Sequence, residues 1–391
     1  MAEIKNIVMI GAGLMGHNAA QICLMASYNV TLVDIKDEFV DAGVAKIEEG
    51  LKKLEAKGKL GEGVSAVNLM ANLKKTIDLA SAVKDADFII EAVVERMDIK
   101  KQVFKTCDEN APPHCILASN TSTMSITEIA TATNRPDKVI GVHFFNPPIL
   151  MRLIEVIAGE KSSDESMNIG VEVSESLPCL KGKRFVPKVL KDRPGFIVNR
   201  LNAPVQIYLN SVFDEAAEKG IPWEQIDADA AGLMPMGPCE LSDYVGIDTL
   251  YHGSKYYEET LSPDFKPGKV ITKMFEENKL GRKSPQGFFD WSAGRPKIDK
   301  SQKAGLFSIE NSMAIMLNEG CRLLEEKVVT GFKVIDDANM AGMNTPGPFG
   351  GGKSQYEKWS KVLEDLADST GKEYFRPCEL MKSGGFVSMR K

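Results

Sequence analysis

The sequence has little of what would mark a secreted, membrane-spanning or nucleic-acid-binding protein. Its 48 Lys and Arg nearly balance 54 Asp and Glu, so the net charge of −6 gives no electrostatic reason to expect nucleic acid as a partner. No apolar run approaches the roughly 18 residues of a membrane span, and the N-terminus shows no signal-peptide pattern. The seven cysteines form no C-x-x-C pair, which argues against a disulfide framework or a metal site. Reduced thiols in a cytoplasmic protein are the simplest interpretation.

The length of 391 residues is too great for one ordinary hydrophobic core, so two or three domains are expected. In the first 160 residues or so, short β-branched runs alternate with longer amphipathic stretches. This pattern predicts an α/β domain with a doubly wound parallel sheet and helices on both faces. Strands are predicted at Lys5–Ile10, Asn29–Asp34, Asp87–Ala92, Ile116–Ser119, Val139–His143 and Leu153–Ile157. Helices are predicted at Leu14–Met25, Phe39–Ala56 and Met97–Asp108.

From about Arg193 the strand-like runs vanish, and helical segments are separated by Gly-Pro turns. A faint repeat is visible within this half, because the pattern of 199–238 returns at 311–348 with Asn311 in the place of Asn199. We therefore predict domains at 1–192, 193–295 and 296–391, the last two being tandem helical units.

A glycine motif, Gly11-Ala-Gly13-Leu-Met-Gly16, follows the first predicted strand and opens a helix. Gly11 permits the tight turn, Gly13 lets the backbone approach a pyrophosphate, and Gly16 allows close helix–strand packing. Asp34 closes the next strand, where it can accept hydrogen bonds from ribose hydroxyls, which favours NAD over NADP. The alternative is a plain glycine-rich turn with Asp34 at the surface.

His143 has the most unusual setting of the four histidines, at the carboxyl end of a buried-looking strand that faces the cofactor cleft. In the following strand, alternation places Glu155 on an apolar face, which is costly unless the carboxylate is paired. His143 is the natural partner, since a carboxylate would orient the imidazole and stabilise its protonated form. His114 and His252 are interpreted as ordinary core or surface residues.

Short polar side chains follow another strand, in the run Ser-Asn-Thr-Ser at 119–122. They supply hydroxyl and amide donors at the same edge of the sheet, although Thr123 and Ser125 could equally cap a helix. Asn199, at the start of the helical half, could bind a substrate oxygen or only stabilise a contact between domains.

Eight motifs occur in the order found in L-3-hydroxyacyl-CoA dehydrogenases, a family that the chain resembles from residue 4 to about 291. They are GAGLMG, VVER in the place of V-V-E-N, ASNTST, HFFNPP, LIEVI, PGFIVNRL, PMGPCELSDYVGIDT and LGRKSPQGFF. The remaining segment resembles the duplicated domain of multifunctional fatty-acid oxidation proteins. The resemblance implies a Rossmann-type domain followed by all-α 3-hydroxyacyl-CoA dehydrogenase C-terminal domains in tandem, with NAD as cofactor and an acyl-CoA as substrate.

By this resemblance His143 is the general base and Glu155 its partner, while Ser122 and Asn199 hold the substrate hydroxyl and the thioester carbonyl region. Lys57 matches a position near the coenzyme A phosphate. The positions assigned to NAD binding are Gly11, Gly13, Leu14, Met15, Gly16, Asp34, Glu95, Lys100, Asn120 and Lys283.

The sequence also departs from the family pattern. Gly50 stands where a serine that helps to bind coenzyme A is common, and Arg96 replaces a common Asn. About six extra residues precede PGF and are expected to lengthen a strand near the domain junction. The chain has no enoyl-CoA hydratase segment.

We expect an NAD-dependent dehydrogenase that oxidises L-3-hydroxyacyl-CoA to 3-ketoacyl-CoA, with His143 taking the hydroxyl proton while the C3 hydride passes to the nicotinamide. A dehydrogenase of free 3-hydroxy acids is one alternative, but it would need a basic clamp that is not evident near Ser122. A non-catalytic binding or structural protein of the same fold is the other. Retention of His143, Glu155, Ser122 and Asn199 together argues against it.

The tandem helical units suggest an internal substitute for a dimer partner. Single-copy relatives, as the resemblance implies, pair as homodimers through this unit, because a lone unit would expose an apolar face. The short SAGRP linker keeps the second unit at high effective concentration. We therefore predict that 296–391 docks on 193–291 in the place of a partner subunit and carries no catalytic residue of its own.

Overall fold

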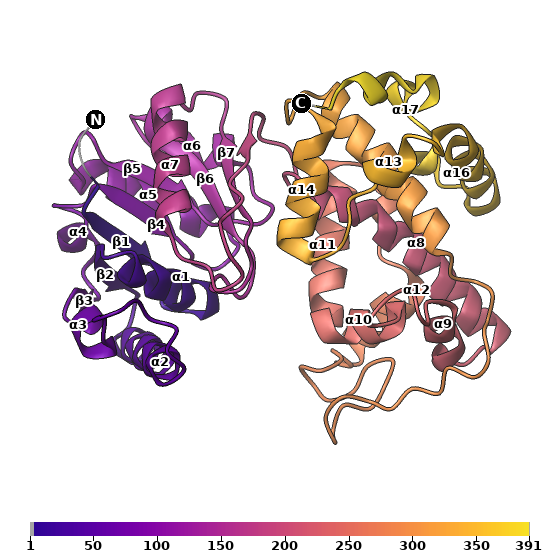
Figure 1. The fold of residues 1–391 in the computed structure, drawn as a ribbon, viewed down its shortest axis with the longest axis horizontal. Helices are drawn as coiled ribbons and strands as arrows, with labels where there is room; N and C mark the ends of the chain where they lie inside the picture. Colours follow the sequence, from indigo (N-terminus) through magenta and orange to yellow (C-terminus); the bar gives the residue numbers. More distant parts are fainter. Residues whose placement is uncertain (1–3, 391) are drawn as a thin grey trace. The chain divides into compact units, whose positions relative to one another are not determined.

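The computed structural model describes residues 4–390 and divides the chain into two compact units (Figure 1). The first unit runs to Val198 and also takes in residues 327–330 and 334–346. The second unit holds Asn199–Glu326, residues 331–333 and the chain from Gly347 onward.

An eight-stranded sheet with the order β3-β2-β1-β4-β5-β6-β7-β8 forms the centre of the first unit. The strands are β1 (Asn6–Ile10), β2 (Asn29–Val33), β3 (Leu73–Thr76), β4 (Phe88–Glu91), β5 (Ile116–Ser119), β6 (Val139–Phe144), β7 (Ile154–Ala158) and β8 (Lys188–Val189). β1 lies between β2 and β4, so the chain changes direction across the sheet at β1, as in doubly wound folds that bind ligands at this edge. The predicted fold class is confirmed.

The sheet is not wholly parallel, which corrects the prediction. β1 to β6 pair in parallel, but β7 runs antiparallel to β6, with His143 directly opposite Glu155. The reason is that only a short connection separates β6 from β7, and a parallel return would need a longer crossover. β8 forms in the extra residues before PGF and extends the sheet by a parallel pair with β7.

Helices lie on both faces of this sheet (Figure 1). The predicted helices are present as α1 (Leu14–Met25), α2 (Asp37–Ala56) and α5 (Met97–Asn110). The other helical elements are α3 (Ala66–Met70), α4 (Leu79–Ala82), α6 (Ile126–Ala130), the 3₁₀ turn η1 (Pro136–Lys138) and α7 (Asp164–Ser176). The side chains between the helices and the sheet form a continuous apolar core that includes Ile7, Met9, Leu32, Phe88 and Ile140.

The second unit is helical. Its elements are α8 (Val198–Lys219), α9 (Trp223–Asp229), α10 (Pro238–Val245), α11 (Ile247–Thr260), η2 (Pro263–Phe265), α12 (Lys269–Glu276), α13 (Ile309–Glu325), α15 (Phe349–Gly352), α16 (Tyr356–Thr370), η3 (Glu373–Phe375), α17 (Glu379–Ser383) and η4 (Gly385–Ser388). α14 (Phe332–Met343) begins in the second unit, but from Val334 its residues belong to the first. Within residues 4–390 no helix combines the length and the apolar character that crossing a membrane requires.

Candidate active site

The glycine turn after β1 has the geometry that its motif predicts. Gly11 has φ +101°, and a Cβ there would lie 2.5 Å from the Ala92 carbonyl oxygen. A Cβ at Gly16 would lie 1.8 Å from the Gly11 oxygen, so α1 can approach the turn only with glycine. At Gly13, by contrast, an added Cβ meets no atom within 4 Å. The first turn of α1 therefore has open backbone where a pyrophosphate would bind.

Asp34 lies at the carboxyl end of β2, half-buried beside this turn. Its Oδ2 accepts a hydrogen bond from Ala12 N at 2.7 Å, and its Oδ1 accepts one from Ile35 N at 2.7 Å. Ile35 is 79% exposed, and Leu14 and Val94 are each 61% exposed at the same edge of the sheet. These exposed apolar side chains fit the flat rings of a dinucleotide, so the residues present suit NAD.

A buried ion-pair network lies beyond β4. The Lys100 ammonium, 1% exposed, is 2.8 Å from Glu91 Oε1 and 3.1 Å from Glu95 Oε2. Glu91 Oε2 accepts a hydrogen bond from Ser119 Oγ at 2.6 Å, and Glu95 Oε1 accepts one from Ser122 N at 2.9 Å. Lys100 and Glu95 were expected to bind NAD, and here they fix the loop that carries Ser122. Glu91 was missed, although an acid that ends the apolar strand Phe-Ile-Ile-Glu was a usable signal.

The loop after β5 carries Asn120 and Ser122. Asn120 is 9% exposed, and its Oδ1 accepts a hydrogen bond from Phe144 N at 2.9 Å, which ties the end of β5 to the end of β6. Ser122 is half-buried, and within residues 4–390 its hydroxyl has no hydrogen-bond partner, so it is free for a ligand. Ser125 caps α6 by accepting a hydrogen bond from Glu128 N, which was the alternative interpretation of this serine.

His143 and Glu155 are hydrogen-bonded across the β6–β7 pair. Nδ1 of His143 lies 2.7 Å from Glu155 Oε2, and the two residues are 3% and 0% exposed. Because a carboxylate can only accept, Nδ1 carries the proton and donates it, which leaves Nε2 as the acceptor for another proton. The rings of Phe145 and Phe196 pack on the imidazole at centroid distances of 4.6 and 5.7 Å.

The other oxygen of Glu155 is held by the backbone that leads into α8. Oε1 accepts hydrogen bonds from Ile197 N at 3.2 Å and Val198 N at 3.0 Å. The preceding Gly195 and Phe196 have φ +79° and +57°, and this left-handed turn directs both N–H groups at the carboxylate. A left-handed phenylalanine costs about 1–3 kcal/mol, and it is held here by a ring that is 0% exposed. Glu155 is thus a fully bonded, buried acceptor.

The remaining predicted residues are not all in the first unit. Lys57 is exposed at the C-terminal end of α2, and Met15 is half-buried on α1. Asn199 is half-buried in the first turn of α8 and belongs to the second unit. Lys283, also in the second unit, bonds both carboxylate oxygens of Asp248 at 2.8 and 3.0 Å.

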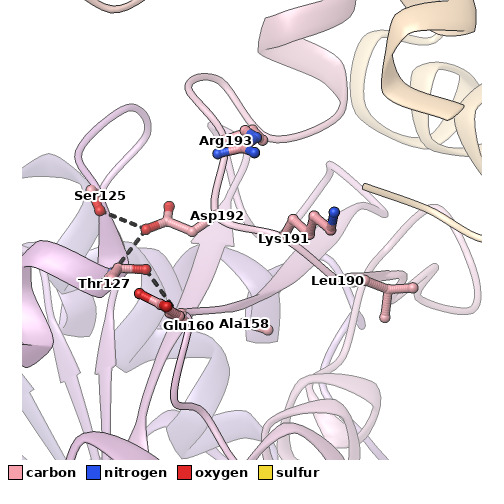
Figure 2. A pocket seen from close by; sticks show the side chains of 9 residues that line it. Ser125, Thr127, Ala158, Glu160, Leu190, Lys191, Asp192 and Arg193 are labelled. Carbon is pink, nitrogen blue, oxygen red and sulfur yellow. Dashed lines mark hydrogen bonds between the residues drawn. The ribbon is translucent and has the colours of Figure 1, made fainter. Parts of the chain in front are cut away.

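A separate cavity of about 670 Å³ lies beside the segment that precedes Gly195 (Figure 2). It is lined by Ser125, Thr127, Ala158, Gly159, Glu160, Leu190, Lys191, Asp192 and Arg193. Figure 2 shows Asp192 turned toward Ser125 and Thr127; its Oδ2 accepts from Ser125 Oγ at 2.6 Å and Thr127 N at 2.8 Å. None of the predicted site residues lines this cavity. Among residues 4–390 no cluster of three or more His, Cys, Asp or Glu could hold a metal ion.

Comparison with known proteins gives two family matches. Residues 6–186 match the family described as 3-hydroxyacyl-CoA dehydrogenase, NAD binding domain, and residues 195–291 match its C-terminal domain. The mitochondrial hydroxyacyl-coenzyme A dehydrogenase of Sus scrofa is 38% identical over 299 residues, which are 74% of this chain and 91% of that protein.

Two further similar proteins also match the chain beyond residue 291. The fatty acid oxidation complex subunit alpha of Psychrobacter cryohalolentis is 33% identical over 378 residues, covering 90% of this chain but only 50% of that protein. The crystal structure of 3-hydroxybutyryl-CoA dehydrogenase from Escherichia coli K12 has a TM-score of 0.86 at 25% identity and covers 99% of both chains.

Proposed function

The chain belongs to the 3-hydroxyacyl-CoA dehydrogenase family, and from that premise we propose how its own residues carry out the NAD-dependent oxidation of a 3-hydroxyacyl-CoA. The observation that carries the proposal is the hydrogen bond of 2.7 Å between His143 Nδ1 and Glu155 at the carboxyl end of β6. This edge of the sheet also holds the glycine turn and Asp34.

NAD is the cofactor, and the residues proposed to hold it surround the ends of β1, β2 and β4. The open backbone at Gly13 and the N-terminus of α1 suit the pyrophosphate, and Asp34 suits the ribose hydroxyls. Leu14, Met15 and Val94 suit the rings. Glu95, Lys100 and Asn120 are proposed to shape the NAD site by fixing the loop after β5. Lys283 is proposed to contact NAD, as the resemblance implies.

The proton is handled by His143. When bound, NAD supplies the acceptor for the hydride that leaves C3 of the substrate. His143 Nε2 accepts the proton of the 3-hydroxyl group, because Nδ1–H is fixed by Glu155. The buried carboxylate then stabilises the imidazolium that forms. A positioned base of this kind contributes about 10²–10⁴-fold to the rate.

The substrate contacts follow from the groups left free. The Ser122 hydroxyl is proposed to bind the substrate hydroxyl, and Asn199 the thioester carbonyl region. Lys57, exposed at the end of α2, is proposed to lie near the coenzyme A phosphate. Gly50 has no side chain and so offers no hydroxyl for that contact, and an added Cβ there would lie 2.0 Å from Gln21 Oε1.

The test is a kcat/KM series over 3-hydroxyacyl-CoA substrates of increasing chain length, with NAD and NADP each supplied and the L and D isomers compared. We expect NADH formation from the L isomers and little from free 3-hydroxybutyrate. Oxidation of the free acid at a similar kcat/KM would favour the free-acid alternative. Absence of NADH formation from every hydroxyacyl-CoA would favour the non-catalytic one.

We also propose that residues 193–295 and 296–391 are two copies of one helical unit, docked as a dimer would be. The order α8, α9, α10, α11, η2, α12 is followed by α13, α14, α15, α16, η3, α17. Asp214 accepts from Lys269 N and Val270 N at the start of α12, and Glu325 accepts from Leu380 N in the first turn of α17. These caps occupy similar places in the two halves, and Asn311 lies in the first turn of α13 as Asn199 lies in the first turn of α8.

The contacts between the copies support pairing through equivalent surfaces. Tyr374 N of η3 donates to Asp264 Oδ2 of η2 at 2.8 Å, and the Tyr374 ring packs on Phe265 at 4.8 Å. The two 3₁₀ turns are counterparts, and counterparts meet at the axis of a twofold pair. Arg200 of α8, 2% exposed, forms an ion pair with Glu319 of α13.

Truncation tests this role. A chain that stops after Trp291 should dimerise or aggregate, because the face covered by the second copy becomes exposed. Sedimentation of the truncated and full chains measures this. A truncated chain that stays a soluble, active monomer would refute the proposal.

We further propose a cytoplasmic location, for which the state of the cysteines is the support. All seven are free, and five of them are buried. This usage is typical of a reducing compartment. A native disulfide found after purification without reductant would contradict it.

A further inference from the structure

The loop that joins His143 to Glu155 is held by contacts outside the sheet. The β6–β7 ladder ends at the pair Phe144–Ile154, so residues 145–153 lie beyond it. Arg184, 5% exposed, donates from Nη1 to the carbonyl oxygens of Pro148 at 2.9 Å and Met151 at 2.6 Å. This guanidinium fixes the middle of the loop from one side.

The second support comes from α14, which lies in the segment 296–391. Ala341 O accepts a hydrogen bond from Arg152 N at 3.2 Å. At Gly342 an added Cβ would lie 2.7 Å from Leu153 Cδ2 and 3.5 Å from Phe145 Cδ1. A side chain at residue 342 would therefore have to displace the buried Leu153 side chain, while it would only touch Phe145.

Both of these contacts lead directly to the catalytic pair. The Phe145 ring packs on the His143 imidazole at 4.6 Å. Leu153, 0% exposed, leads into β7, whose second residue is Glu155. A shift of Phe145 or Leu153 would consequently move the imidazole or its carboxylate partner. In a close-packed interior such a shift is transmitted rather than absorbed.

We propose that the second helical copy is a positioning element of the active site, acting through α14 on the loop between His143 and Glu155, with Gly342 as the residue that sets the approach. The proposal rests on the proposed function of His143 and Glu155. It gives the second copy a role in the reaction, although that copy supplies no group that touches the substrate.

The test compares two glycine substitutions in the full chain. Gly342→Ala should lower kcat by about 10- to 100-fold, since small misplacements of catalytic groups have effects of this order. The Kd for NADH, measured by its fluorescence, should stay within about twofold, because the glycine turn at Gly11 is untouched. Gly350→Ala is the matched control, since an added Cβ at this exposed glycine meets no atom within 4 Å. The control should keep the wild-type kcat.

A compensating change separates positioning from a loss of folding. Leu153→Val removes the δ-methyl that the new Cβ would strike, so the pair Gly342→Ala/Leu153→Val should recover most of the lost kcat relative to Leu153→Val alone. This pair also carries the test if Gly342→Ala does not fold. The proposal is overturned if Gly342→Ala lowers only Tm and leaves kcat at the control value, or if the pair recovers nothing. Assaying the wild type alongside separates failure of the proposed function from failure of the positioning role. An active wild type together with an unaffected Gly342→Ala variant refutes only the positioning role.

Discussion

Replacing Glu155 by glutamine tests the chemistry of the His143 pair with almost no change in shape. The carboxylate accepts three hydrogen bonds, one from His143 Nδ1 and two from Ile197 N and Val198 N. Glutamine offers one acceptor oxygen and one NH₂ donor in the same space. Its oxygen is expected to turn toward the two backbone N–H groups, because facing them with NH₂ would leave two buried donors unpaired.

The NH₂ group of glutamine would then face Nδ1 and donate to it. The imidazole proton would have to move to Nε2, and Nε2 could no longer accept the proton of the substrate hydroxyl. Loss of the competent tautomer of a catalytic histidine lowers kcat by about 10²–10⁴-fold. This corresponds to about 2.7–5.5 kcal/mol of activation free energy.

The assay is steady-state NADH formation from an L-3-hydroxyacyl-CoA, together with NADH binding by fluorescence. Glu155→Gln should lower kcat and leave NADH binding unchanged, since Glu155 lies outside the glycine turn. Glu240→Gln is a suitable control, because Glu240 is a 2% exposed glutamate of the second unit, paired with Arg295 and distant in sequence from the site. A Glu155→Gln enzyme with a kcat within about threefold of wild type would refute the tautomer argument.

Three further predictions concern the cofactor site and the second unit. Asp34→Ala should narrow the ratio of kcat/KM for NAD over NADP, since the carboxylate repels a 2′-phosphate, and an unchanged ratio would remove Asp34 from the site. Burial raises the pKa of the Asp227 carboxyl from its ordinary 3.8 to about 6, so the folded state holds this proton more tightly than the unfolded chain does. The resulting stabilisation is present below about pH 4 and is lost as the pH rises through about 6. Between these limits, urea unfolding should show the wild type losing about 3 kcal/mol of stability relative to Asp227→Asn. A difference in unfolding free energy that stays constant with pH would contradict this prediction. Glu319→Ala removes the carboxylate that pairs with the buried Arg200 and Arg322, so it should lower the free energy of unfolding by about 3–5 kcal/mol. A loss below about 1 kcal/mol would count against this ion-pair network.

The strands that are buried apolar runs could be predicted from the sequence, and the exposed strand could not. β1, β4 and β5 are fully or almost fully buried apolar runs, and their predicted positions are confirmed. β3 reads Leu-Lys-Lys-Thr, with two exposed lysines, so nothing apolar distinguished it. The direction of β7 was wrong because a buried strand has the same pattern in either direction, and only the short connection after β6 distinguished the two.

The contact between His143 and Glu155 could be anticipated because a carboxylate inside an apolar strand needs a partner. The network of Glu91 was missed because its partners, Lys100 on α5 and Ser119 on β5, come from other elements and nothing in the local pattern of β4 identifies them. The resemblance assigns Lys100 to NAD binding, and the structure adds that its ammonium is buried between Glu91 and Glu95. Sequence reasoning therefore found a partner for Glu155, which lies within an apolar strand. It did not find that Lys100 pairs with Glu91, which lies at the end of one.

The proposed duplication accounts for the fact that the contacts of α14 could not be predicted from the sequence. Its proposed counterpart α9 has 7 residues, whereas α14 has 12, a difference of about 7.5 Å in helix length. Aligning Asp227 with Asp336, as the repeat does, places the added residues after Ala338, and these include Ala341 and Gly342. The contacts with Arg152 and Leu153 thus come from the part of α14 that has no counterpart in the first copy. On the proposed duplication, the second copy thus carries a helical turn that packs on the loop between His143 and Glu155, which is the pattern expected when a duplicated domain is retained for support rather than for chemistry.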